Sequence, residues 1–399
     1  MATTAHHRVV IVGGGSAGIS VAARLKKGVD DIAVIDPSEK HYYQPLWTLV
    51  GGGCSNRETS ERTEASVMPK GVTWIKDAVT AFDPDNNQVS TDGGQTIGYD
   101  VLVVCPGIQL DWGKIPGVTE TLGSNGVSSN YTYDLAPKTW EFIQGTRSGS
   151  AVFTMPSGPI KCAGAPQKIA YLACDYWRSQ GVLDDIDVHL VLPTPRTFGV
   201  PVFADALDEV VADYGINVHL NSELESVDPD GKKATIKSME EDGAGFTLSY
   251  DMMHVVPHQS APDWVKSSPL ATDAPTGYVD VDKHTHQHAI YKNVFSLGDA
   301  GSTPNSKTGA AIRKQAPVVA ANVLQQLSGK DPSKEYDGYA SCPLTTSRHA
   351  MLLAEFDYSL EPAPSFPVIN LQKPRRDMWY LKKYGLPFLY WNLMLKGRA

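Results

Sequence analysis

The chain has 399 residues, of which 42% are hydrophobic and 20% charged, a composition typical of a folded protein large enough for two domains. Its net charge of −9 argues against a nucleic-acid partner, because phosphate binding needs an excess of Lys and Arg. Five cysteines without a CxxC pair argue against a secreted disulfide framework and against a metal site. No apolar run approaches the roughly 20 residues that span a bilayer, so we expect an intracellular protein.

Residues 8–36, RVVIVGGGSAGISVAARLKKGVDDIAVID, carry the most specific motif of the chain. A buried strand, a helix and a second strand are expected here, with a G-x-G-x-x-G pattern between the first strand and the helix. The pattern consists of Gly13, Gly15 and Gly18, and Asp36 ends the second strand. Such glycines permit a tight turn beside a pyrophosphate, and the acid accepts hydrogen bonds from a ribose. The segment therefore predicts a dinucleotide site, for either FAD or NAD.

A second α/β unit begins near Ser150, after turns and short strands that are typical of a β-meander. Its alternation of strands and helices predicts a parallel sheet with right-handed crossovers. The expected order is strand 151–154, helix 167–177, strand 187–193, helix 204–215 and strand 217–220.

The loop MPSGPIKCAGAPQK, residues 155–168, stands where this second unit would bind a nicotinamide dinucleotide. Pro156, Pro159 and Pro166 remove N–H groups that would cradle a pyrophosphate. The strand DVHLVLP is followed by no acid for a ribose. We therefore expect the fold to be kept and NAD(P)H not to be the electron donor.

Cys162 lies in this loop, just before a helix and between Lys161 and Lys168. A helix N-terminus and nearby cations lower the pKa of a thiol, which favours a reactive cysteine. The alternative is that a cysteine is a small buried hydrophobic residue. We expect that alternative for Cys105 and Cys174, and Cys54 has no evident partner. KHTHQH (283–288) is interpreted as an exposed strand edge rather than a metal site.

Residues 293–323, NVFSLGDAGSTPNSKTGAAIRKQAPVVAANV, resemble the second FAD motif of the two-dinucleotide-binding-domain flavoproteins of the disulfide reductase superfamily. In that family the Asp, here Asp299, binds the ribityl and phosphate region of FAD. YDVLVVCPG (99–107) resembles the mid-chain strand and turn of the family and ends at Gly107. The resemblance implies that the first site binds FAD.

The same resemblance implies an α/β fold with two Rossmann-like domains, the second inserted in the first, and a C-terminal extension. We expect residues 1–115 and 293–330 to form the FAD-binding domain and residues 116–292 to form the second domain with Cys162. Residues 331–399 would form an extension that associates with a membrane.

PIKCAGAPQKIAYL (159–172) is similar to the redox-cysteine loop of sulfide:quinone oxidoreductase, in the branch that includes the mitochondrial enzyme. Further similar blocks are HYYQPLWTLVGGG (41–53), FGVPVFADAL (198–207), EYDGYASCPLTT (335–346) and LPFLYWNLMLKG (386–397). The resemblance implies that Cys162 and Cys342 form a redox pair. Sequence alone does not select this pair among the five cysteines.

The resemblance also implies a reaction. Sulfide attacks a Cys162–Cys342 disulfide, or a sulfur-bridged form of it, and two electrons pass through FAD to ubiquinone or menaquinone. Cys342 would receive the sulfane sulfur, which leaves to sulfite, a small thiol or cyanide, and Cys162 would face the flavin. Lys307 would stabilise the reduced flavin; the alternative is a solvated surface lysine.

The last 27 residues, 373–399, contain seven Lys and Arg against one acid, Asp377, together with several Trp, Tyr and Phe. This pattern predicts an interfacial helix pair, broken by Gly385 and Pro387 into pieces too short to span a bilayer. The alternative is a terminal helix that caps the core. We expect a peripheral (monotopic) membrane protein on the cytoplasmic face of a bacterial cell membrane, without the N-terminal extension of a mitochondrial form.

Two other functions compete with sulfide oxidation. A type II NADH:quinone oxidoreductase shares the fold and the membrane habit, and a non-catalytic relative would keep FAD as a sulfide sensor. The presence of both Cys162 and Cys342 argues against the sensor. The sequence does not fix the oligomeric state and allows a homo-oligomer.

Overall fold

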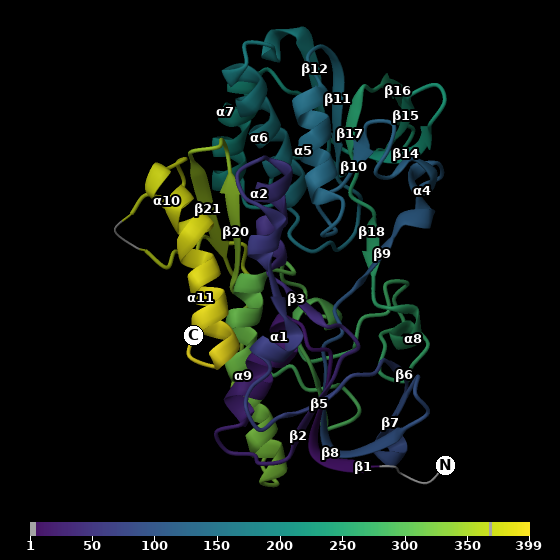
Figure 1. The fold of residues 1–399 in the computed structure, drawn as a ribbon, viewed down its shortest axis with the longest axis vertical. Coiled ribbons are helices and arrows are strands. Elements are labelled where there is room, and N and C mark those ends of the chain that lie inside the picture. The colour runs from purple at the N-terminus through teal and green to yellow at the C-terminus, as the bar shows by residue number, and fades with distance from the viewer. Residues whose placement is uncertain (1–4, 367–368) are drawn as a thin grey trace.

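The computed structural model of the chain describes residues 5–366 and 369–399. Two sheets with parallel cores follow one another along the long axis of the molecule, and helices cover them (Figure 1). The fold is α/β, with two Rossmann-like domains, the second inserted in the first, and a C-terminal extension. The predicted fold class is therefore confirmed.

The first sheet has seven strands in the order β5-β2-β1-β8-β7-β6, and β19 also pairs with β8. The strands β1, β2, β5, β8 and β19 run parallel, whereas β6 and β7 form an antiparallel edge. Their bounds are β1 (Ala5–Val12), β2 (Ile32–Ile35), β5 (Thr73–Ile75), β6 (Val79–Asp83), β7 (Gln88–Thr91), β8 (Thr96–Val104) and β19 (Val294–Ser296). Helices α1 (Ser16–Leu25) and α9 (Gly309–Leu327) pack against each other over this sheet.

The second sheet has five parallel strands in the order β10-β17-β11-β12-β13. They are β10 (Val127–Ser128), β11 (Gly149–Thr154), β12 (Ile186–Val191), β13 (Asn217–His219) and β17 (Met252–His254). Its helices are α5 (Ala136–Gly145), α6 (Ala165–Ser179) and α7 (Pro201–Tyr214). An antiparallel sheet of β14 (Ser222–Asp228), β15 (Lys233–Ser238) and β16 (Phe246–Ser249) lies beside it (Figure 1).

The chain crosses between the two sheets on a pair of short antiparallel strands, β9 (Gln109–Asp111) and β18 (His258–Ser260). Directly after β18, Ala261, Val265 and Leu270 already pack with Val10 and Val104 of the first sheet. We therefore propose that the chain returns to the first domain at β18, ahead of the residue 293 that the sequence pattern indicated.

Short elements complete the two domains. They are β3 (Lys40–Tyr42), β4 (Glu61–Thr63), α2 (Trp47–Gly51), α3 (Glu64–Val67), α4 (Val118–Thr121) and α8 (Asp263–Lys266). Of these, α2 lies against α5 and α6 of the second domain, so it brings the two domains into contact.

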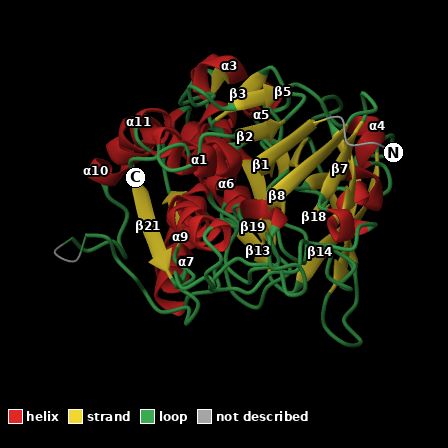
Figure 2. Cartoon of the chain, turned by 90° about the horizontal axis from the view of Figure 1, so that it is seen from below, coloured by secondary structure: helices red, strands yellow, loops and turns green. Residues whose placement is uncertain are grey.

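The C-terminal extension begins with an antiparallel hairpin of β20 (Ala340–Thr345) and β21 (Met351–Phe356). The hairpin packs into the core of the second domain against α6. The chain then runs through α10 (Arg376–Tyr380), a π-helical turn (Leu381–Gly385) and α11 (Leu386–Asn392) to the side of α1. Figure 2 shows α10, α11 and β21 on the side of α1 and α9, away from β7.

The expected break at Gly385 and Pro387 is wrong, because residues 376–392 form one continuous helical run. Pro387 lacks the N–H that would donate to the carbonyl group four residues earlier. The wider π-helical turn before it accommodates the missing hydrogen bond without ending the helix. Within residues 5–366 and 369–399, no helix combines the length and hydropathy that a membrane crossing needs.

The interpretation of residues 283–288 as an exposed strand edge is also wrong. They form a turn in which His286 and His288 are 0% and 2% exposed. His288 accepts the N–H groups of Ile290 and Tyr291 on Nδ1 at 3.0 and 3.1 Å, so it serves the turn itself. The described residues hold no cluster of His, Cys, Asp and Glu suited to a metal ion.

Candidate active site

The glycine loop after β1 has the shape that a dinucleotide needs. Gly13 has a φ of +104°, and a Cβ there would collide with the carbonyl oxygen of Cys105. A Cβ on Gly18 would collide with the Gly13 carbonyl in the same way. Gly15, by contrast, is exposed, and a Cβ there would meet nothing within 4 Å. The loop therefore turns tightly and leaves its backbone open to a ligand.

Asp36 follows β2 and braces this loop. Its carboxylate accepts the Gly14 N–H at 2.6 Å and the Ser38 N–H at 2.8 Å. Gly107 follows β8 with a φ of +81°, and the space beside its α-carbon is also open within 4 Å. These residues meet at the carboxyl ends of β1, β2 and β8, where parallel sheets bind ligands.

Asp299 and Lys307 lie at the same edge, between β19 and α9. Burial raises the pKa of Asp299, and the ammonium groups of Lys307 and Lys161 oppose that rise. Lys307 is only 5% exposed, and its Nζ donates to the Gly301 carbonyl at 2.8 Å. Burial lowers the pKa of Lys307 to about 8. The alternative of a solvated surface lysine is therefore wrong, and Lys307 is a buried cation near the partly buried carboxyl group of Asp299.

The Cys162 loop is bound to this edge through its backbone. The Cys162 N–H donates to the Lys307 carbonyl at 2.9 Å, and the Tyr131 hydroxyl donates to the Lys161 carbonyl at 3.0 Å. Cys162 has a φ of +51°, a left-handed conformation that non-glycine residues adopt rarely and at a cost. The contacts on both sides hold the cysteine in that conformation.

Cys342 lies on β20, which the hairpin places against the first turn of α6. A Cβ built on Gly164 would collide with the Leu344 side chain and lie 3.9 Å from the Cβ of Cys342. Cys162 and Cys342 are free thiols that lie close enough for a hydrogen bond from Cys342 to favour the Cys162 thiolate. That bond from Cys342, together with the nearby lysines, lowers the pKa of Cys162 well below its usual range. The same bond and burial raise the pKa of Cys342.

Two buried lysines flank the thiol pair. Lys168 is 2% exposed, and its Nζ donates to the Cys162 sulfur at 3.0 Å. Lys382 comes from the C-terminal helix and donates to the Pro45 carbonyl at 3.1 Å. Burial, with repulsion from Lys168, lowers the pKa of Lys382 to about 7. The sequence pointed to Lys168 by its spacing, but no local signal placed Lys382 at the site.

Comparisons with known proteins identify the chain. Residues 7–316 match the family "Pyridine nucleotide-disulphide oxidoreductase". The mitochondrial sulfide:quinone oxidoreductase of Dictyostelium discoideum is 45% identical over 395 residues, which cover 98% of this chain and 86% of that protein. The chain belongs to the sulfide:quinone oxidoreductase family.

Two further relatives agree with this placement. The mitochondrial sulfide:quinone oxidoreductase of Mus musculus is 42% identical and covers 98% of this chain and 87% of its own length. The crystal structure of the sulfide:quinone oxidoreductase from Aquifex aeolicus has a TM-score of 0.82 at 21% identity, with 100% and 92% of the two chains covered. At that identity the likeness concerns the fold.

Sulfide:quinone oxidoreductases use FAD, and the first site fits this cofactor. Gly15, Gly107 and Gly309 leave open space around their α-carbons at the carboxyl edge of the first sheet. The N-terminus of α1 would bind the pyrophosphate, and Asp36 stands where the family places its ribose acid. The Cys162 loop is hydrogen-bonded to the same edge through the Lys307 carbonyl.

The corresponding place in the second domain is filled by the protein itself. Leu344 covers the N-terminus of α6, where a nicotinamide dinucleotide would place its pyrophosphate. Pro166 lies in the first turn of α6. The side-chain amide of Gln167 donates to the Thr197 carbonyl, which holds the loop after β12 against this turn. In this member of the sulfide:quinone oxidoreductase family, the strand with Cys342 therefore packs against the start of α6.

The other three cysteines lie apart from the pair in unreactive settings. Cys105 and Cys174 are 5% and 0% exposed, and burial raises the pKa of both thiols. Burial also raises the pKa of Cys54, although Arg348 opposes the rise. The expectation that these are ordinary buried or incidental cysteines agrees with these surroundings.

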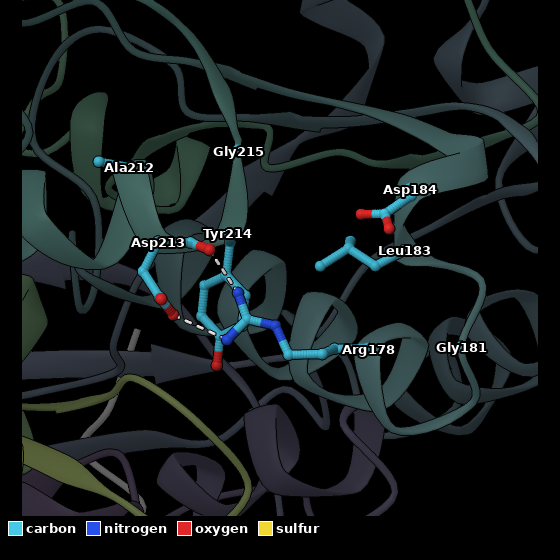
Figure 3. Close-up of a pocket in the computed structure, with 8 residues that line it drawn as sticks. All are labelled: Arg178, Gly181, Leu183, Asp184, Ala212, Asp213, Tyr214 and Gly215. Carbon is cyan, nitrogen blue, oxygen red and sulfur yellow. Dashed lines mark hydrogen bonds and ion pairs between the residues drawn. The ribbon is translucent and has the colours of Figure 1, made fainter.

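A surface depression lies at the far ends of α6 and α7, away from the thiol pair (Figure 3). Arg178 is its main charged group, and its Nη1 donates to Asp213 at 2.8 Å. The guanidinium also lies 4.3 Å from the centre of the Tyr214 ring. Arg178 is therefore already paired within the protein and is not free to bind a substrate anion.

Proposed function

We propose that this protein oxidises sulfide through Cys162 and Cys342 and passes two electrons through FAD to a membrane quinone. The observation that carries the proposal is the pair of neighbouring free thiols, in which the Nζ of Lys168 lies 3.0 Å from the Cys162 sulfur. A thiolate is the reactive form in disulfide exchange, and a cation beside it favours that form.

The reaction begins with the pair joined as a disulfide. Hydrosulfide attacks the Cys342 sulfur, a new S–S bond forms there, and the Cys162–Cys342 bond breaks with its electron pair left on Cys162. A small nucleophile then removes the sulfane sulfur from Cys342. Oxidation of the two thiols back to the disulfide releases two electrons and two protons. FAD, when bound, accepts the electrons and passes them to quinone.

The roles of the two cysteines follow from their surroundings. Cys162 is the better leaving group, because the Lys168 ammonium beside its sulfur stabilises the thiolate that departs. The backbone N–H of Cys162 donates a hydrogen bond to the Lys307 carbonyl, at the edge of the first sheet where FAD would bind. Cys342 has a raised pKa and stands on β20, on the other side of the pair. We therefore assign Cys162 to the flavin and Cys342 to the sulfane sulfur.

Sulfide, but not NADH, is expected to bleach the flavin of the purified holoenzyme under anaerobic conditions. The reason is that β20 fills the place a nicotinamide dinucleotide would need. The measurement is the visible flavin absorbance after rapid mixing, followed by reoxidation with a short-chain quinone. Bleaching by NADH and not by sulfide would favour the NADH:quinone alternative instead. Flavin that neither donor bleaches would favour the non-catalytic sensor.

The acceptor of the sulfane sulfur is proposed to be a small nucleophile, such as sulfite, a low-molecular-weight thiol or cyanide. Its arrival is favoured by the cationic surroundings of the pair, Lys168 and Lys382, because these acceptors react as anions. Chromatography of the sulfur products formed with each acceptor would identify the preferred one.

We further propose that the C-terminal helix rests on a membrane surface. Tyr380, Tyr384 and Phe388 are 58%, 59% and 61% exposed, and their spacing of four residues places them on one face. On the other face, Trp379 and Tyr390 are buried in the core of the first domain. The helix thus caps the core, as the alternative interpretation held, and also offers an aromatic stripe (Tyr380, Tyr384 and Phe388) to an interface.

The relatives with mitochondrial names lend no support to the predicted cytoplasmic face of a bacterial membrane. We therefore propose the membrane surface without assigning it to a bacterial cell. A quinone is apolar, so a protein that rests on the lipid would receive it directly from the bilayer.

Replacing all three stripe residues by serine is expected to weaken binding to anionic lipid vesicles by about tenfold or more, because each large apolar side chain contributes about 1.5–3 kcal/mol when buried. Co-sedimentation with vesicles measures the binding. Ile290→Ser, at a residue 71% exposed in another part of the surface, is the matched control. Unchanged sedimentation of the triple variant would refute the membrane assignment.

A further inference from the structure

The C-terminal helix touches the dinucleotide loop through one hydroxyl group. Tyr390 of α11 lies with its hydroxyl oxygen 2.7 Å from the Oγ of Ser16. Ser16 is the first residue of α1 and follows Gly15, the exposed glycine of the loop. Tyr390 is only 3% exposed and belongs to the core of the first domain. A residue near the end of the sequence therefore contacts the start of the helix that would bind the FAD pyrophosphate.

The contact is part of a buried chain of polar groups. The Tyr390 hydroxyl lies 2.5 Å from Nε2 of His41, and Nδ1 of His41 lies 3.1 Å from Oε2 of Glu64. His41 and Glu64 are 3% and 2% exposed. With the Nδ1–H of His41 donated to Glu64 and its Nε2 accepting from Tyr390, hydrogen bonds run in one direction from Ser16 through Tyr390 and His41 to Glu64. Buried polar chains of this kind hold their members in fixed rotamers.

The hydrogen-bonded chain ends at an oxygen of Glu64 that lies beside the glycine loop after β1. The second carboxylate oxygen of Glu64, Oε1, is buried and has no hydrogen-bond partner among the described residues. A Cβ built on Gly14 would lie 2.7 Å from this oxygen and 3.0 Å from the Cβ of Asp36. A buried carboxylate oxygen without a partner is costly. Its place beside Gly14 and Asp36 indicates that a donor at the dinucleotide site completes the network.

We propose that Tyr390 is a positioning residue of the FAD site, which holds Ser16 and the start of α1 in place through the buried chain to His41 and Glu64. The inference rests on the FAD site of the proposed function. Its consequence is that the affinity for FAD depends on the C-terminal helix, although that helix contributes none of the glycine motif.

Tyr390→Phe in the full-length protein is expected to weaken FAD binding by about tenfold, because it removes one buried hydroxyl and leaves two buried partners unsatisfied. The protein is stripped of FAD and titrated with FAD, and the quenching of flavin fluorescence gives the dissociation constant. Tyr214→Phe is the matched control, since Tyr214 donates a buried hydroxyl to the Thr346 carbonyl at 3.0 Å, away from the loop. It is expected to leave the FAD dissociation constant unchanged.

Ser16→Ala tests the same contact from the other side, with Ser20→Ala as its control on the same helix. Ser16→Ala is expected to weaken FAD binding similarly, and Tyr390→Phe added to it is expected to cause less than about a twofold further change. An unchanged dissociation constant in Tyr390→Phe, or the same loss in Tyr214→Phe, would overturn the inference. If Tyr390→Phe does not fold, the comparison of Ser16→Ala with Ser20→Ala decides alone. Wild-type protein that takes up no FAD would instead refute the proposed function.

Discussion

Replacing Cys162 by serine is expected to slow sulfide-dependent flavin reduction by about a thousandfold or more, as removal of a nucleophile does in other enzymes. Serine cannot form the disulfide that sulfide attacks, and its hydroxyl is not ionised at neutral pH. The FAD loop around Gly13 and Gly15 is untouched, so the variant is expected to bind FAD. Rapid anaerobic mixing with sulfide measures the flavin absorbance directly.

Cys342→Ser is expected to give a loss of the same size, because the two sulfurs act as one unit. Cys54→Ser is the matched control, since Cys54 is a partly buried free thiol outside the pair. Alkylation of the reduced wild-type protein should modify Cys162 first, because its pKa is lowered and that of Cys342 is raised. Full sulfide-dependent quinone reduction in either pair variant would refute the proposed mechanism.

Replacing Lys168 by methionine is expected to shift the alkylation of Cys162 to higher pH by about one unit and to slow flavin reduction at neutral pH about tenfold. The Lys168 ammonium is one of the groups that lower the pKa of Cys162. Without it the pKa rises, and less thiolate is present at any pH below that value. The measurement is the rate of alkylation by iodoacetamide as a function of pH, in the reduced protein.

Lys168→Arg separates the charge from the loss of packing, because arginine keeps the positive charge and much of the side-chain volume. It is expected to retain a low pKa at Cys162 even if turnover falls. A pH profile that stays in place in Lys168→Met would show that the Cys342 hydrogen bond alone holds the pKa down. In that case Lys168 would have no role in activating the thiol.

The local elements of the fold could be predicted because each depends on neighbouring residues. The helix and the second strand expected within residues 8–36 are α1 (Ser16–Leu25) and β2 (Ile32–Ile35). The helix expected over residues 167–177 lies within α6 (Ala165–Ser179). Apolar runs and helical periodicity identify such elements, and glycine or proline marks their ends.

The site itself depends on packing that no local pattern contains. Cys342 reaches Cys162 because a hairpin docks on α6, and Lys382 reaches the pair from a helix near the other end of the sequence. The alternation of histidines in residues 283–288 was misleading for the same reason. A buried turn uses His288 to bond its own backbone, and periodicity alone cannot distinguish that arrangement from a strand edge.

Ser16 and Tyr390 are separated by 374 residues, and this separation has a consequence for the order of events during synthesis. The ribosome makes the glycine loop first, so Ser16 lacks its contact with Tyr390 until residue 390 has been added. Contacts between residues so far apart form late, because closing a long loop costs chain entropy. A nascent chain could fold its first sheet early, yet FAD captured at that stage would be held less firmly. Loading of the cofactor is therefore expected to be completed only when the last helix has docked.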